Sequence, residues 1–253
     1  MKWLYRIYQL FIALPILLIL TGLACMFTIV GCALGSAHFW GYWPLSIISR
    51  LYCRVLLLPV HVEGREQLDR KTSYVFVSNH QGAFDIFLIY GFLGRNFKWM
   101  MKKSLRNIPM VGKACESANH IFVDKSGPKA IQRTYANARE ILRGGTSVVI
   151  FPEGARTFTG HMGIFRRGAF QLADELQLPV VPITLNGPFD VYPRTRKGVS
   201  FVDWHPLTMK IHAPIYPKGQ GLEYEKETQQ KAYEIIMAGL PEERQGYIKN
   251  EDQ

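Results

Sequence analysis

The first fifty residues constrain the fold most, because they contain a long stretch without any charged side chain. No Asp, Glu, Lys or Arg occurs from Ile7 to Ser49, and residues 10–34 form one apolar block of 25 residues. As a helix this block would be about 37 Å long at 1.5 Å per residue, which is enough to cross a bilayer. A core helix of a soluble domain is rarely so long, so we expect this segment to hold the protein in a membrane.

Two alternatives in which the segment is cleaved off fit less well. The apolar core exceeds the roughly 7 to 15 residues usual for a secretory signal peptide. Residues Ile29 to Cys32 loosely resemble a lipoprotein cleavage box, but no polar break separates the apolar block from Cys32. We therefore expect the segment to be retained.

Basic residues on both flanks favour a chain that enters and leaves the membrane on the same side. Lys2 and Arg6 precede the uncharged stretch, and further basic residues follow from Arg50 onward. Such flanks prefer the cytoplasmic side. A second apolar stretch, Phe39 to Val60, begins with aromatic residues typical of membrane interfaces. We predict a two-helix membrane element over residues 1–58, either a hairpin or two helices dipping into one leaflet, and a domain over residues 59–253 on the cytoplasmic face of the membrane.

Composition narrows the function of that domain. The net charge of +10 suits an anionic membrane surface, nucleic acid or a phosphorylated substrate. No helix-turn-helix, zinc-finger or RNA-binding pattern appears, so we do not expect nucleic acid as a partner. The four cysteines lack the spacing of metal ligands or of a disulfide framework. We expect no metal site and a reducing environment.

Apolar runs of strand length alternate with helical patterns along residues 59–253, which predicts an α/β fold with a mainly parallel central sheet flanked by helices. Helices are expected over Ala130–Leu142, Gly168–Leu176 and Tyr224–Ala238. The expected strands are Val60–Glu63, Tyr74–Ser78, Phe97–Met100, Ile121–Val123, Val148–Phe151, Val180–Leu185 and Thr208–His212. In such sheets, functional residues gather at the carboxyl ends of the strands.

The strand that begins at Tyr74 ends in a polar cluster, N-H-Q-G-A-F-D, from Asn79 to Asp85. Gly82 allows a tight turn, so the carboxylate of Asp85 is able to orient the ring of His80. The other ring nitrogen can then take a proton from a hydroxyl group. By itself, this spacing would more simply predict a turn histidine beside a helix-capping aspartate.

A second strand end repeats the pattern about seventy residues later. The apolar run Ser147 to Phe151 is followed by P-E-G-A-R, which ends at Arg156. Arg156 offers a planar fork of donors for a phosphate, and Glu153 is suited to hold that fork in place. A base and an anion clamp at two strand ends indicate chemistry on an alcohol that bears a phosphate.

These blocks resemble the N-H-x-x-x-x-D and F-P-E-G-T-R signatures of the glycerolipid acyltransferases. Their order and separation are most similar to the bacterial lysophosphatidic acid acyltransferases, formally 1-acyl-sn-glycerol-3-phosphate O-acyltransferases. Weaker similarities lie at Lys102, at Ile121 to Lys125 and at Val181 to Ile183. The resemblance covers about residues 60–215, and the chain departs from the usual pattern at Ala155 (Thr in the family) and Lys125 (Arg in the family).

The resemblance implies an acyl transfer that forms phosphatidic acid. Acyl-CoA or acyl-carrier protein would be the donor, and no metal or prosthetic group would take part. His80 would be the general base and Asp85 its partner, while the substrate-binding residues would be Glu153, Gly154, Arg156, Lys102 and Lys125. Because Ala155 and Lys125 lie on the head-group side, other acceptors stay open: glycerol-3-phosphate, another lysophospholipid or a lyso-aminolipid. A thioesterase would use the same base on water but would have no use for the Arg156 clamp.

Overall fold

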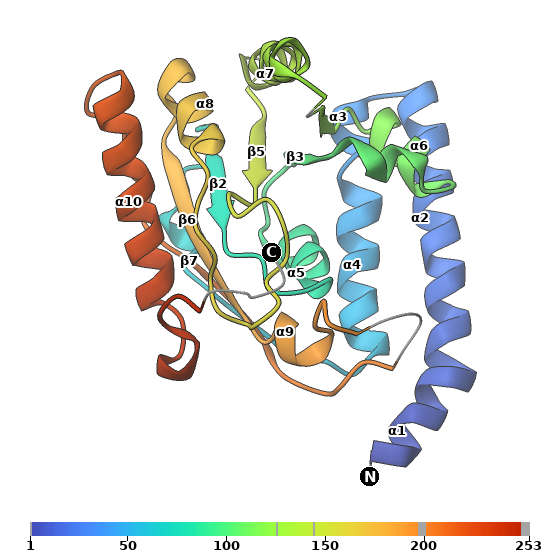
Figure 1. Cartoon of the computed structure of the whole chain (residues 1–253). Coiled ribbons are helices and arrows are strands. Elements are labelled where there is room, and N and C mark those ends of the chain that lie inside the picture. Colours follow the sequence, from blue (N-terminus) through green and yellow to red (C-terminus); the bar gives the residue numbers. More distant parts are fainter. Residues whose placement is uncertain (1, 125, 144, 197–200, 249–253) are drawn as a thin grey trace.

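A seven-stranded sheet forms the centre of the computed structural model, which describes residues 2–124, 126–143, 145–196 and 201–248 (Figure 1). The strands lie within two residues of the expected positions at every end. They are β1 (Val60–Glu63), β2 (Val75–Ser78), β3 (Phe97–Lys102), β4 (Ile121–Val123), β5 (Ser147–Ile150), β6 (Val180–Asn186) and β7 (Leu207–Ile211).

The sheet order is β1-β7-β6-β2-β5-β3-β4. All pairs are parallel except β6 with β7, so β7 and β1 run opposite to the other five strands. The predicted mainly parallel α/β fold is confirmed. β2 lies at the centre between β6 and β5, which places its carboxyl end beside the ends of both neighbours.

Side chains that alternate along the strands separate two hydrophobic cores. On β2, Phe76 belongs to one core, whereas Val75 and Val77 belong to the other. The first core lies under α4 (Trp43–Val55) and α5 (Phe84–Phe92). The second is covered by α7 (Pro128–Arg143), α8 (Gly168–Leu176) and α10 (Leu222–Ala238). Both faces of the sheet are thus buried, as expected for strands that read as continuous apolar runs.

Most of the uncharged N-terminal stretch lies in one helix from Lys2 to Leu34, made of α1 (Lys2–Tyr8), a π-helical turn (Gln9–Ala13) and α2 (Leu14–Leu34). Within the described residues it is the one helix that is long and apolar enough to cross a membrane. Most of its large apolar side chains are exposed, among them Phe11, Leu18, Ile19 and Leu34.

The expected second membrane helix is not confirmed. The chain turns back at α3 (Ala37–Trp40), and α4 then runs alongside α2 (Figure 1). However, α4 has only 13 residues, and one side of it packs against α5. The hydrophobic stretch Phe39 to Val60 therefore serves in part to cover the sheet domain, a use that apolar composition alone does not distinguish from contact with lipid.

Candidate active site

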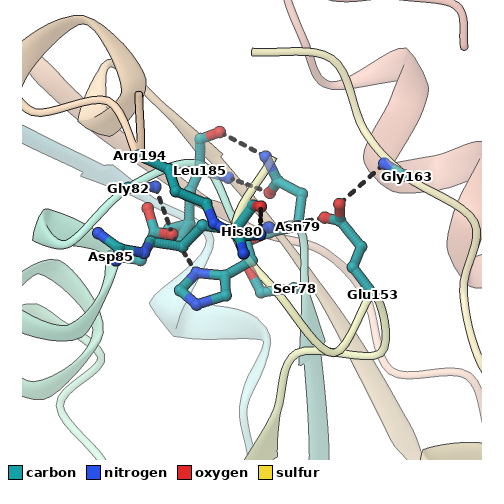
Figure 2. A network of polar contacts seen from close by, with 10 residues as sticks. Ser78, Asn79, His80, Gly82, Asp85, Glu153, Gly163, Leu185 and Arg194 are labelled. Atoms are coloured by element: carbon teal, nitrogen blue, oxygen red, sulfur yellow. Dashed lines mark hydrogen bonds and ion pairs between the residues drawn. The ribbon is translucent and has the colours of Figure 1, made fainter. Parts of the chain in front are cut away.

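His80 and Asp85 form a hydrogen-bonded pair at the carboxyl end of β2 (Figure 2). His80 is the second residue after the strand, and Asp85 lies in the first turn of α5. The Nδ1 atom of His80 is 2.6 Å from Oδ2 of Asp85, which also accepts the backbone N–H of Gly82 at 2.9 Å. Asp85 is fully buried, whereas 15% of the His80 side chain is exposed. Asp85 thus occupies Nδ1 and leaves Nε2 as the nitrogen that can accept a proton.

Burial raises the pKa of the Asp85 carboxyl group, and the hydrogen bonds from His80 and Gly82 oppose that rise. A buried carboxylate that accepts two hydrogen bonds gains charge stabilisation from both donors. The same contacts fix the orientation of the imidazole. The pair therefore has the geometry of a histidine base held by a buried carboxylate.

The turn that joins the two residues requires glycine at position 82. A Cβ atom on Gly82 would lie 2.4 Å from the carbonyl oxygen of Pro188, in α9 (Pro188–Val191). Gly82 also forms an isolated antiparallel bridge with Pro193. The segment after β6 thus presses against the turn between His80 and Asp85.

An aromatic ring packs flat against the His80 imidazole. The rings of His80 and Phe151 are stacked, with centroids 3.9 Å apart and an interplanar angle of 9°. Trp99 stacks with Phe151 in turn, at 5.6 Å. Because Phe151 follows β5 and Trp99 lies on β3, the two neighbouring strands support the imidazole from one side.

Asn79 fixes the end of β2 to β6. Its side-chain amide donates to the carbonyl oxygen of Leu185 and accepts the N–H of Leu185, both at 2.8 Å. The ladder between β2 and β6 ends at Ser78, so the Asn79 side chain supplies the partners that the next residue of a longer strand would supply. We did not predict this role, although Asn79 immediately precedes the histidine.

Glu153 has a different role from the one expected. We predicted that it holds Arg156, but its Oε1 atom accepts the backbone N–H of His80 at 2.7 Å, and its Oε2 accepts the N–H of Gly163 at 2.8 Å. Burial raises its pKa to about 8, and the two N–H donors oppose that rise. Glu153 thus faces inward and joins the segment after β2 to the loop before α8. Gly154 next to it has a φ of +76°, a conformation that favours glycine.

The backbone next to Arg156 contacts His80 directly. The N–H of Thr157 donates to the carbonyl oxygen of His80 at 2.9 Å, and the Arg156 side chain is half-buried. Lys102 is exposed at the end of β3, and β5 separates that strand from β2. The structure therefore brings Arg156 close to the pair and leaves Lys102 farther away. Lys125 lies outside the described residues.

Arg194 also belongs to this region, although no sequence argument singled it out (Figure 2). Its Nη1 atom donates to the carbonyl oxygen of Arg156 at 3.0 Å, and its guanidinium carbon lies 4.0 Å from the ring centroid of Phe158. The only sequence signal was a local excess of basic residues in P-R-T-R-K, from Pro193 onward.

Comparisons with known proteins agree with the sequence signatures. The 1-acyl-sn-glycerol-3-phosphate acyltransferase of Arabidopsis chloroplasts (Arabidopsis thaliana) is 30% identical over 207 residues, which is 78% of this chain and 57% of that protein. The alpha 1-acyl-sn-glycerol-3-phosphate acyltransferase of Mus musculus is 34% identical over 161 residues, 63% of this chain and 56% of that protein. The chain thus spans little more than half the length of these relatives.

A solved structure matches along nearly the whole chain. The crystal structure of the 1-acyl-sn-glycerophosphate (LPA) acyltransferase PlsC from Thermotoga maritima superimposes with a TM-score of 0.77 at 26% sequence identity and covers 98% of each chain. The family described as Acyltransferase matches residues 59–186, from the residue before β1 to the end of β6. That span is half of the chain and includes both signatures. The chain therefore belongs to the acyltransferase family.

Proposed function

We propose that this protein transfers a fatty acyl group from acyl-CoA or acyl-carrier protein to the free hydroxyl of 1-acyl-glycerol-3-phosphate, forming phosphatidic acid. The relatives and the structural neighbour are named as enzymes for this acceptor. In this chain one observation carries the proposal: a partly exposed histidine at a strand end has its Nδ1 atom held 2.6 Å from a buried carboxylate. That arrangement suits a base for a hydroxyl nucleophile.

The reaction proceeds without a nucleophile on the enzyme. Nε2 of His80 takes the proton from the acceptor hydroxyl as its oxygen attacks the thioester carbonyl carbon. The tetrahedral intermediate then collapses, the carbon–sulfur bond breaks, and the imidazolium returns the proton to the leaving thiolate. Asp85 remains a carboxylate throughout and stabilises the imidazolium that forms between the two steps.

The acceptor phosphate would bind on the Arg156 side of the base. An arginine fork forms two parallel hydrogen bonds to a phosphate, and the half-buried position of Arg156 strengthens them. Gly154 and Glu153 shape the backbone that leads to Arg156, while Lys102 and Lys125 would supply longer-range positive charge. Ala155 lacks the hydroxyl that the family signature usually places beside this arginine.

The apolar helix would place this reaction at a membrane. We infer that residues 1–58 anchor the protein and that the active site faces the cytoplasm, because basic residues flank the uncharged stretch on both sides. Single cysteines introduced at Trp3 and Arg70, in a chain whose own cysteines have been replaced, should both react with a reagent added to the cytoplasmic side. Reaction from opposite sides would establish a single crossing instead.

The activity test uses membranes that contain the protein, a labelled acyl donor and a panel of acceptors. We expect 1-acyl-glycerol-3-phosphate to be acylated in preference to glycerol-3-phosphate, other lysophospholipids, lyso-aminolipids and water. His80→Ala should lower turnover by about 10²- to 10⁴-fold, the usual contribution of a positioned general base. His61→Ala is the matched control, since His61 lies on the edge strand β1. Preference for another acceptor would replace the proposed substrate, and full activity of the His80 variant would refute the proposed base.

A further inference from the structure

Arg194 reaches the active site from a loop outside both signatures. It follows α9, in the segment that presses on the turn between His80 and Asp85 through the bridge of Gly82 with Pro193. Two hydrogen bonds connect Arg194 to His80: the Arg194 side chain donates to the carbonyl oxygen of Arg156, and the backbone N–H of Thr157, the residue after Arg156, donates to the carbonyl oxygen of His80. Figure 2 draws Arg194 in the same close-up as His80 and Asp85.

Two contacts hold the guanidinium group in place. One N–H donates to the Arg156 carbonyl oxygen at 3.0 Å, and the guanidinium carbon lies over the Phe158 ring, 4.0 Å from its centroid. A guanidinium has five N–H donors, so most of its donors remain available to a ligand. Stacking on an aromatic ring also leaves the hydrogen-bonding edges of the group uncovered.

Within the described part of the chain, the charge of Arg194 is not neutralised by a carboxylate. Among the residues that the structure describes, no carboxylate forms an ion pair with Arg194, which is half-buried. Neighbouring arginines differ in this respect: Arg196 pairs with Asp203, and Arg244 pairs with Asp190. A partly desolvated cation that is held rigidly and lacks a counter-ion is suited to bind an anion.

We propose that Arg194 is a second anion-binding residue of the active site and that, with Arg156, it binds the phosphate of the acceptor. The inference rests on the proposed function for the identity of the phosphate. Phosphate groups occur in both substrates, as the acceptor's phosphomonoester and as the phosphates of CoA or of the carrier protein's prosthetic arm. The position of Arg194 against the Arg156 backbone assigns it to the acceptor.

The test compares Arg194→Gln and Arg194→Lys with Arg196→Gln as the matched control. Arg196 lies on the same loop, but its charge is used by Asp203. KM and kcat are measured for 1-acyl-glycerol-3-phosphate, for the acyl donor, and for 1-monoacylglycerol as an acceptor without phosphate. Inorganic phosphate serves as an independent probe, through inhibition of the reaction and through its effect on thermal unfolding.

We expect Arg194→Gln to raise the KM for the phosphorylated acceptor about 10- to 100-fold, the range for hydrogen bonds to a charged group, with donor KM within about twofold of wild type. Acylation of monoacylglycerol should be unchanged, and inorganic phosphate should lose its inhibition and its stabilising effect. Arg194→Lys should have a KM for the phosphorylated acceptor between those of wild type and Arg194→Gln, because lysine keeps the positive charge but lacks the planar fork of donors.

Three outcomes would overturn the inference. A raised KM for the donor alone would assign Arg194 to the donor. An equal loss of kcat with every acceptor would make its role structural, and the folded Arg194→Lys protein distinguishes that case if the Gln variant is unstable. Unchanged kinetics would remove the role altogether. If the wild-type protein fails to acylate 1-acyl-glycerol-3-phosphate, the proposed function fails. Whether Arg194 binds an anion is still decided by comparing the effect of inorganic phosphate on the thermal unfolding of wild type and of Arg194→Gln.

Discussion

Asn79 allows a quantitative test of how the active-site strand is held. β2 forms ladder pairs with β6 only as far as Ser78 and Ile183. Beyond that point β2 no longer pairs with β6. The Asn79 side chain instead forms hydrogen bonds with the backbone N–H and C=O of Leu185, both at 2.8 Å. Asn79 and Leu185 are almost fully buried, so water cannot replace the amide easily.

The substitution Asn79→Ala removes both partners at once. An unsatisfied buried backbone group costs about 1–3 kcal/mol, so the two groups of Leu185 together should destabilise the protein by about 2–6 kcal/mol. In a domain of this size 1 kcal/mol lowers Tm by about 2–4 °C, which gives an expected decrease of roughly 4–24 °C. Because His80 is the next residue, kcat should fall as well, with smaller changes in either KM.

The assay is thermal unfolding of the detergent-solubilised protein together with steady-state acyl transfer. Gln230→Ala is the control, because this exposed amide on α10 bonds only to the Glu234 side chain, and its loss should change Tm by less than about 2 °C. Asn79→Asp is a second probe: it keeps an acceptor for the Leu185 N–H but places a carboxyl group in the core. A Tm for Asn79→Ala within 2 °C of wild type, by the same scale, would refute the account of the strand end.

Two further predictions concern the surroundings of the base and the core behind it. Phe151→Leu should lower kcat about two- to tenfold with both KM values unchanged, because an aromatic stack contributes about 0.5–1.5 kcal/mol to the placement of the imidazole. Phe151→Tyr keeps the aromatic ring and should have the wild-type rate. A wild-type kcat in Phe151→Leu would show that the stack is dispensable. His120 is buried against Tyr90, and burial lowers its pKa to about 3, so the folded state binds its proton less readily than the unfolded state and stability should fall as pH drops below 6.5. At pH 5.5 this loss of stability is about 1.4 kcal/mol. When Tm is measured at pH 7.5 and at pH 5.5, the decrease in Tm between the two should be smaller by about 3–6 °C in His120→Asn than in wild type. Identical decreases in the two proteins would contradict the assignment.

The positions of the central strands β2, β5 and β6 were predictable because these strands are buried on both faces and therefore appear as apolar runs. The direction of β7 was not, since a buried strand has the same pattern in either orientation and only its connection decides how it pairs. The packing of α4 against the sheet domain could not be predicted either. Its apolar and aromatic residues suit lipid and protein equally well, and its packing against α5 depends on the sheet that brings the two helices together.

The site was predictable where its chemistry is local. His80 and Asp85 are five residues apart around one glycine turn, so the sequence could indicate that the two side chains lie within reach of each other. Glu153 shows the opposite case: its partner is a backbone N–H 73 residues away, and side-chain chemistry suggested a nearby arginine instead. Arg194 was missed for the same reason, because its position depends on how the chain continues after β6.

Packing contacts connect the apolar helix to the His80–Asp85 pair, and they determine how the enzyme would meet a lipid acceptor. The side chain of Gln9, in the π-helical turn, donates to the carbonyl of Val202 and accepts its N–H, both at 2.9 Å. The helix also packs on α4, and α4 packs on α5, the helix that carries Asp85. These contacts leave little freedom for the domain to rotate relative to the helix. Once the helix is seated in a bilayer, the direction in which Nε2 of His80 faces is therefore fixed by protein packing, and a membrane-bound acceptor would meet a base that is already oriented.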